Sequence, residues 1–309
     1  MKWKMNGVAA FLLALVTTGF NGFAQGRPMS VPGDVELVSN VVFGKGGDRE
    51  LKMDLLKPKK AAAEPMPVVV FIFGGAWRTG SKESGIKPLS VLAQKGYFCV
   101  SIEYRFSQEA IFPAQLEDCK TAIRFLRSKA AEYHINPDKI GVWGMSSGAH
   151  LAALLGTTGD VKDFEGTGGA AEFSSRVNAV VDWFGPTDFT RMDAAGSKMK
   201  HDPADSPESR LVGGAIQENK DKCAKASPLT YVTSDDPPFL IMHGDRDPVV
   251  PINQSELLVA ALTKAKVKCV FQPVPGGGHG FVGPQHEKKV LEFFDEQLRG
   301  IKPKPKVGE

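Results

Sequence analysis

The sequence contains little that would build a metal centre or a nucleic-acid surface. It has only four cysteines and six histidines among 309 residues, and neither a CxxC pair nor an HExxH segment occurs. We therefore expect no zinc site. The formal net charge is only +3, so electrostatics gives no argument for a nucleic-acid partner.

The four cysteines are too few and too widely spaced to define a disulfide framework. They are Cys99, Cys119, Cys223 and Cys269. An even number permits disulfides in an exported protein, but spacing does not assign the pairs. Cys99 falls in an apolar strand pattern and Cys119 on the apolar face of a helix, so we expect both to be buried thiols.

No stretch reaches the roughly 20 apolar residues that a membrane-spanning helix needs. The most apolar run, Val8–Val16, follows two lysines and precedes Gly22 and Ala24, which place small residues two apart. This pattern predicts a signal peptide over residues 1–24, and an uncleaved anchor is the alternative. We expect a mature domain over residues 25–309, a secreted or periplasmic location, and no stable membrane association after cleavage.

Short apolar runs alternate with helical patterns through the rest of the chain. Strand patterns occur at residues 51–55, 68–73, 98–104, 140–143, 179–184, 239–242 and 268–274. Amphipathic helices are predicted from Pro113 onward and around residues 290–298. Buried strands separated by helices predict an α/β fold, a mostly parallel central sheet with helices on both faces. Residues 187–234 show no clear strand and are predicted to form a small inserted cap.

In such sheets, ligands bind beyond the carboxyl ends of the strands, so residues that directly follow strands are the candidates for chemistry. Gly144-Met145-Ser146-Ser147-Gly148 matches G-x-S-x-G between a strand pattern and a helical one. Strand, tight turn and helix together expose a nucleophilic serine, which predicts this role for Ser146. An inert serine in a glycine-flanked turn is the alternative.

Backbone N–H groups are needed to bind the oxyanion of a tetrahedral intermediate. One donor is expected from Ser147, and the others from Gly75 and Ala76 in the loop after the second strand. An ordinary glycine-rich turn is the alternative. A phosphate-binding loop is excluded, because Ser81 and Lys82 occur in the reverse of the required order.

An acid and a base follow the last two strand patterns. Asp247 follows residues 239–242, and His279 lies in the glycine-rich loop after residues 268–274. The order Ser, Asp, His is the order of this kind of triad. Asp245 competes with Asp247 for the acid, and we favour Asp247 because an Asp early in a turn is often a turn former.

Other aromatic and histidine residues receive weaker assignments. Trp77 is predicted to bind substrate beside the oxyanion loop, with Trp183 and Phe184 at the edge of the site, because aromatic faces stack on sugar or feruloyl rings. Burial in the core is the alternative for all three. Among the histidines, we expect His150 to pack in its helix, His243 to order its turn, and three to lie at the surface: His134, His201 and His286.

These motifs together resemble the bacterial esterase and lipase branch of the α/β-hydrolases, and within it the feruloyl and acetyl xylan esterase-like (BD-FAE-like) proteins. The supporting segments are residues 73–82, 103–105, 112–114, 144–155, 227–229 and 237–251. The resemblance implies an α/β-hydrolase fold and serine ester hydrolysis. Two positions depart from the family pattern: Phe73 stands where His is usual, and Ala76 where Gly is usual. Ala76 would be strained if its φ is positive.

The leading functional hypothesis is a carboxylic ester hydrolase that forms an acyl-enzyme and acts on small-molecule or polysaccharide esters, with acetyl or feruloyl groups preferred. This chemistry uses only side chains and water, so no cofactor and no metal are expected. A short-chain lipase or general carboxylesterase is an alternative. A prolyl oligopeptidase-like peptidase shares the late Asp and His motifs, but too few residues precede the first strands for its extra domain. A non-catalytic binding protein is a further alternative, and the oligomeric state stays open.

Overall fold

The computed structural model describes residues 30–281 and 283–302. The predicted signal peptide and the start of the predicted mature domain lie outside these residues. Within them, no helix has the length and apolarity to cross a membrane. The described residues from Val31 onward form one compact unit, which contains every element described below.

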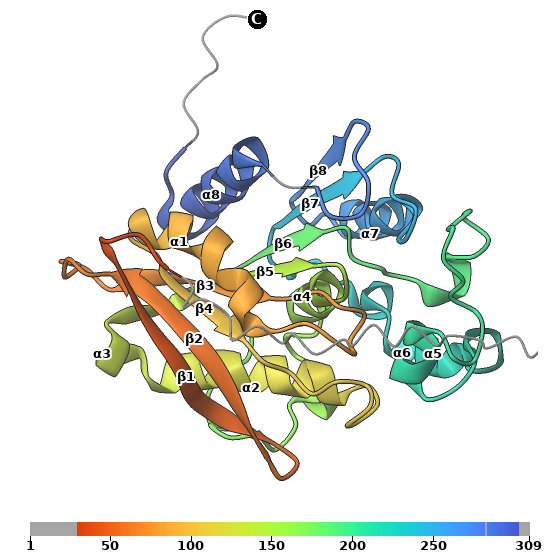
Figure 1. Ribbon diagram of the computed structural model, residues 1–309, viewed down its shortest axis with the longest axis horizontal. Coiled ribbons are helices and arrows are strands. Elements are labelled where there is room, and N and C mark those ends of the chain that lie inside the picture. Colours follow the sequence, from red (N-terminus) through yellow and green to blue (C-terminus); the bar gives the residue numbers. More distant parts are fainter. Residues whose placement is uncertain (1–29, 282, 303–309) are drawn as a thin grey trace, which may run out of the picture. The chain divides into compact units, whose positions relative to one another are not determined.

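An eight-stranded sheet runs through this unit in the order β1-β2-β4-β3-β5-β6-β7-β8 (Figure 1). Strands β1 and β2 pair in antiparallel fashion, as do β2 and β4, and every other pair is parallel. The strands are β1 (Val35–Gly46), β2 (Arg49–Pro58), β3 (Met66–Ile72), β4 (Phe98–Ile102), β5 (Ile135–Met145), β6 (Ala179–Trp183), β7 (Phe239–Gly244) and β8 (Cys269–Val274). The mostly parallel sheet is confirmed, and only β1 among its strands was not predicted.

Helices cover both faces of the sheet. Helices α1 and α8 pack on one face, and α2, α4 and α7 pack on the other (Figure 1). The helices are α1 (Ile86–Gln94), α2 (Ala114–Ser128), α3 (Ala130–Tyr133), α4 (Ser147–Thr157), α5 (Pro207–Val212), α6 (Lys220–Lys225), α7 (Asn253–Lys264) and α8 (Pro284–Arg299). The predicted final helix buries Val290, Phe293, Phe294 and Leu298, whose spacing places them on one face of α8.

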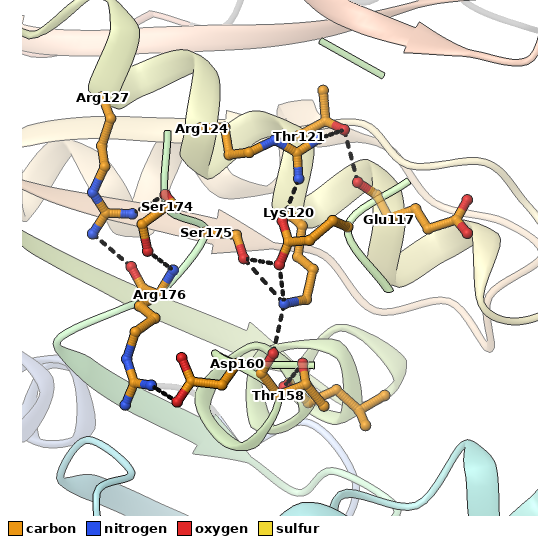
Figure 2. A network of polar contacts seen from close by, with 12 residues as sticks. Glu117, Lys120, Thr121, Arg124, Arg127, Thr158, Asp160, Ser174, Ser175 and Arg176 are labelled. Atoms are coloured by element: carbon orange, nitrogen blue, oxygen red, sulfur yellow. Dashed lines mark hydrogen bonds and ion pairs between the residues drawn. The ribbon is translucent and has the colours of Figure 1, made fainter. Parts of the chain in front are cut away.

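A buried polar network fixes the loop that follows α4 (Figure 2). The ammonium of Lys120 in α2 is fully buried. It donates to the carbonyl of Thr158 at 2.7 Å, to Glu165 Oε1 at 2.9 Å and to Ser175 Oγ at 3.0 Å. Arg124 binds the second oxygen of Glu165 at 2.6 Å. Because a buried cation is tolerated only when it is paired and hydrogen-bonded, this network anchors the C-terminal end of α4 to α2.

The segment between β6 and β7, predicted as a cap, contains only short helices among its described residues. These are the 3-10 turns Phe189–Arg191, Ile216–Glu218 and Pro228–Tyr231, together with α5 and α6. Helix α5 has a strong start, since Ser206 Oγ accepts the N–H of Ser209 at 3.1 Å and Pro207 occupies the first turn. Gly213 ends the helix with φ 75°, a left-handed conformation that favours glycine.

Burial agrees with the sequence pattern in most places and differs in two. Cys99 and Cys119 are buried as expected, and all four cysteines are free thiols. Asp54 alternates with apolar residues in β2, a pattern typical of an exposed side chain, but it is buried with Lys82 Nζ 3.0 Å from its Oδ1. His201 was expected at the surface and is fully buried.

Candidate active site

Ser146 occupies a sharp turn between the end of β5 and the start of α4. Its φ of 53° and ψ of −122° are unusual for a residue with a side chain. The flanking glycines make the turn possible, because a Cβ at Gly144 would collide with the carbonyl of Gly148, and one at Gly148 with the carbonyl of Ile72. This strained strand-to-helix turn lifts the serine Oγ above the carboxyl edge of the sheet.

The predicted serine, histidine and aspartate lie in one hydrogen-bonded row. His279 Nε2 is 2.9 Å from Ser146 Oγ, and His279 Nδ1 is 2.7 Å from Asp247 Oδ2. The loops after β7 and β8 supply the acid and the base. Because Nδ1 faces a carboxylate, it carries the proton, and Nε2 is left to accept the hydroxyl hydrogen of Ser146. The side chain of His279 is 23% exposed, whereas that of Asp247 is fully buried.

The environment of Asp247 keeps it ionised. Its Oδ1 accepts the N–H groups of Val249 at 2.8 Å and Val250 at 3.0 Å. Burial alone would raise the pKa of Asp247, but hydrogen bonds from His243 and His279 outweigh burial and hold that pKa well below its usual range. A fixed carboxylate therefore faces Nδ1 of His279 and favours the tautomer that leaves Nε2 free.

Asp245 has a different role from Asp247. Its Oδ1 accepts the N–H of Gly276 at 2.7 Å, and its own N–H donates to the carbonyl of Val274 at 3.2 Å. Asp245 thus joins the loop after β7 to the loop after β8. This is the turn-forming role that the sequence analysis left to it.

Three backbone amides lie near Ser146, two in the loop after β3 and one at the start of α4. Gly75 and Ala76 line the same cavity as Ser146, and Ser147 begins α4. Among residues 30–281 and 283–302, the N–H groups of Gly75, Ala76 and Ser147 donate to no protein acceptor. Ala76 has φ 55°, the positive value that was expected to strain it, at a cost of about 1–2 kcal/mol.

Aromatic packing fixes this loop where the family pattern has a histidine. The ring of Phe73 stacks on Tyr104 with centroids 4.6 Å apart and planes 20° apart. The hydroxyl of Tyr104 donates to the carbonyl of Phe73 at 3.1 Å. On the far side of the loop, the buried ion pair of Lys82 with Asp54 provides a second anchor. The departure at Phe73 therefore leaves the backbone of the loop well supported.

The assignment of Trp77 to substrate binding is wrong, because its side chain is only 1% exposed. Its indole N–H donates to His150 Nδ1 at 3.3 Å, and His150 Nε2 donates to the carbonyl of Ala226 at 2.7 Å. Burial lowers the pKa of His150 to about 4, so this imidazole is neutral and can accept from Trp77. Trp77 joins the loop after β3 to α4 and to the segment between β6 and β7.

A model of the BD-FAE family matches residues 53–262 of this chain. The chain belongs to the BD-FAE family. It is 33% identical to the probable carboxylic ester hydrolase LipM of Mycobacterium tuberculosis over 254 residues, which cover 78% of this chain and 58% of LipM. The BD-FAE chain therefore spans less than two thirds of the length of this relative.

Two solved structures are also similar to the BD-FAE chain. A truncated carbohydrate esterase from gut microbiota is 36% identical with a TM-score of 0.78, covering 85% of this chain and 96% of that one. The esterase Est2 of Thermogutta terrifontis is 27% identical with a TM-score of 0.70, covering 89% and 96%. Est2 has also been solved with propionate and with butyrate bound. The predicted α/β-hydrolase fold and the BD-FAE resemblance are confirmed.

A cavity of about 690 Å³ opens over Ser146 in this BD-FAE chain. One side is lined by the loop after β3 and carries the exposed Arg78. The lining also includes four apolar residues from other parts of the chain: Phe184, Met199, Pro207 and Val249. We call these last three residues, Met199, Pro207 and Val249, the apolar wall. No sequence pattern predicts this wall, since single apolar residues in polar loops give no periodic signal.

The other predicted edge residues divide between cavity and core. Phe184 is as buried as Trp183, at 2% exposed, but it lines the cavity, and its ring centroid lies 4.7 Å from that of His279. Trp183 is 2% exposed and packs on Trp143, with ring centroids 4.9 Å apart. The core alternative thus holds for Trp183. Among the described residues, no group of three or more histidine, cysteine or acidic side chains is placed to hold a metal ion.

Proposed function

We propose that this protein is a serine ester hydrolase that works through an acyl-enzyme. The observation that carries the proposal is the row Asp247–His279–Ser146, with contacts of 2.7 and 2.9 Å, at the floor of an accessible cavity. A nucleophile, a base and an orienting acid at these distances are the parts that nucleophilic acyl transfer needs.

The first half of the proposed reaction is acylation of Ser146. Ser146 Oγ attacks the ester carbonyl carbon while its proton passes to Nε2 of His279, and the carboxylate of Asp247 stabilises the imidazolium that forms. The carbonyl oxygen becomes an oxyanion, which the free N–H groups of Gly75, Ala76 and Ser147 are placed to bind. When the intermediate collapses, the carbon–oxygen bond to the alcohol breaks. The alcohol leaves with the proton from His279, and the acyl group stays on Ser146.

Deacylation repeats these steps with water. His279 removes a proton from a water molecule, whose oxygen attacks the acyl carbon, and the second tetrahedral intermediate releases the carboxylic acid and restores Ser146. The exposed fraction of His279 supports this step, because it leaves the imidazole accessible to water.

We propose that the substrates are carbohydrates that carry short-chain or aromatic acyl groups. We also propose that the protein is exported. The similarity to a carbohydrate esterase supports the alcohol part. The propionate and butyrate seen in Est2 support a short acyl part. The signal-peptide pattern in residues 1–24 supports export.

A hydrolysis panel tests the function. Purified protein is assayed on acetyl, butyryl and decanoyl esters of one alcohol, on acetylated and feruloylated xylan fragments, and on a prolyl peptide anilide. We expect higher kcat/KM on the acetyl and butyryl esters and release of acetate or ferulate from xylan. Ser146→Ala abolishes these activities, whereas Ser128→Ala, an exposed change on α2, does not.

Two outcomes contradict the proposal. A preference for the decanoyl ester without release from xylan would assign a lipase. Cleavage of the anilide without ester hydrolysis would assign a peptidase.

A further inference from the structure

A buried histidine–glutamate pair lies in the segment between β6 and β7, outside the triad. His201 Nδ1 is 3.0 Å from Glu208 Oε1, and the two side chains are 0% and 4% exposed. Glu208 Oε2 has no hydrogen-bond partner in the described part of the chain. The glutamate therefore depends on the imidazole for its stabilisation in the interior.

The surroundings of His201 fix its charge. Its Nε2 faces the carbonyl of Val249 at 3.0 Å and Ser197 Oγ at 2.9 Å. A carbonyl oxygen only accepts, so Nε2 carries a proton. Nδ1 lies 3.0 Å from Glu208 Oε1 but is not aligned for a hydrogen bond, so this contact is one of charge. With an acceptor at Nε2 and a buried carboxylate beside Nδ1, the surroundings favour an imidazolium paired with a carboxylate.

This ion pair is joined to the apolar wall of the cavity by the chain itself and by one hydrogen bond. Met199 comes two residues before His201, Pro207 comes one residue before Glu208, and the carbonyl of Val249 is itself a partner of the imidazolium. Two residues of the wall are thus close neighbours of the ion pair in the sequence, and the third lies in the loop that His201 contacts.

The same contacts reach the triad through a single residue. The N–H of Val249 donates to Asp247 Oδ1 at 2.8 Å, while its carbonyl accepts from His201. The neighbouring contacts strengthen this junction: Ser197 Oγ donates to the carbonyl of Val249 at 2.7 Å, and the N–H of Lys198 to that of Pro248 at 2.9 Å. The segment and the loop that carries the acid are therefore joined at Val249.

We propose that His201 and Glu208 are positioning residues whose ion pair sets the apolar wall and so determines which acyl groups the cavity accepts. This inference rests on the proposed ester hydrolysis at Ser146. The pair touches neither the substrate nor the reacting atoms. It acts through Met199, Pro207 and Val249, so its effect is on acyl-chain discrimination and on the pH at which discrimination is lost.

The pH dependence has a definite sign. Burial alone would lower the pKa of His201, but Glu208 in α5 and Asp193 in the preceding turn outweigh burial and raise it. The loop that carries Asp247 presents the neutral carbonyl of Val249 to the His201 ring. Because the pKa of His201 is raised on folding, the ion pair stabilises the fold fully below the pKa of the unfolded state, about 6.5. This stabilisation disappears as the pH rises through the pKa of the folded state. The base His279 has the opposite requirement, because it must be neutral to accept the proton of Ser146.

The test compares Glu208→Gln with a matched change, Glu165→Gln, in the network of Figure 2, which lies outside the cavity lining. Each full-length protein is assayed for kcat and KM on butyryl and acetyl esters of one alcohol across the pH range. In addition, imidazole NMR of the Ser146→Ala protein follows the protonation of His201 without needing any ester hydrolysis.

We expect both nitrogens of His201 to be protonated at neutral pH, with a titration above the ordinary value. Glu208→Gln is expected to change the butyryl-to-acetyl ratio of kcat/KM by about tenfold, the low end of the discrimination for one of the two methylenes by which these groups differ. The same variant is expected to remove the alkaline pH dependence of that ratio. Glu165→Gln is expected to retain the wild-type ratio. If Glu208→Gln does not fold, the double variant His201→Gln with Glu208→Gln replaces it, because two amides leave no buried charge.

Two results would overturn the inference: a bare Nδ1 on His201 at neutral pH, or equal ratios in the Glu208 and Glu165 variants. Absence of all ester hydrolysis would instead refute the proposed function, and the NMR titration would still decide whether the ion pair exists.

Discussion

Asp247→Asn is the change for which the structure makes the most definite prediction. The carboxylate accepts hydrogen bonds at both oxygens: Oδ1 from the amides of Val249 and Val250, and Oδ2 from His279, with His243 Nε2 a more distant partner of Oδ2 at 3.4 Å. An asparagine has one oxygen and one NH₂ group. If the oxygen keeps the two amides, the NH₂ faces Nδ1 of His279, which must then give up its proton and move it to Nε2. That tautomer cannot accept the proton of Ser146.

The alternative orientation of the asparagine is no better. Turning the amide restores the contact with His279 but directs NH₂ at two backbone N–H groups, which are buried donors without an acceptor. Both arrangements cost activity, and loss of the correct tautomer costs ~10⁴ in rate in the trypsin-like case. That corresponds to about 5 kcal/mol in the activation free energy.

Asp245→Asn is the matched control. Asparagine keeps an oxygen for the N–H of Gly276, which is the one hydrogen bond that the Asp245 side chain makes among the described residues. We expect less than about a threefold loss, since a neutral acceptor replaces a charged one in an exposed turn. The assay is kcat/KM on an acetyl ester, with circular dichroism to show that both variants are folded. Retention of a tenth of the activity by Asp247→Asn, or a larger loss in Asp245→Asn, would refute the reasoning.

Three further predictions concern the nucleophile, the strained loop and the N-terminus. Ser146→Ala lowers kcat by several powers of ten, on the order of 10⁶ in the best-studied case, and labelling by an active-serine probe disappears with it; residual turnover near a tenth of wild type would exclude Ser146. Ala76→Gly relieves a positive φ and stabilises the fold by about 0.5–1 kcal/mol in urea unfolding. The control Ala260→Gly in α7 destabilises the fold by about 1 kcal/mol. Equal effects of the two changes would contradict the strain at Ala76. N-terminal sequencing of the exported protein finds Gln25 or a neighbour first, and a full-length chain in the membrane fraction would contradict cleavage.

The sequence predicts the inner strands well because these are buried on both faces. Residues 68–72 of β3 are at most 1% exposed, so they read as one continuous apolar run. The edge strand β1 gives no such signal. It buries Val35 and Phe43 but exposes Val38 and Val42, and two register shifts interrupt its alternation. An irregular edge strand is recognisable only from its pairing with β2.

The positions of the triad residues follow from the topology, because each comes directly after a parallel strand and the carboxyl ends of parallel strands share one edge. Trp77 and His201 show what the pattern cannot provide. Both lie in loops, where burial depends on contacts with a distant segment. Trp77 is covered through His150 and Phe189, and His201 through Glu208 and the acid loop. Neither contact produces a periodic pattern in the sequence.

The complete burial of Lys120 has a consequence for chemical footprinting. An amine-reactive reagent needs an unprotonated and accessible Nζ, and this one is fully buried beneath the loop that follows α4. Lys82, which is 2% exposed under the oxyanion loop, is shielded in the same way. Acylation at these two lysines, read by mass spectrometry, would therefore time the opening of two separate regions, one at the C-terminal end of α4 and one under the oxyanion loop. The exposed Lys129 and Lys288 would react throughout and serve as internal standards.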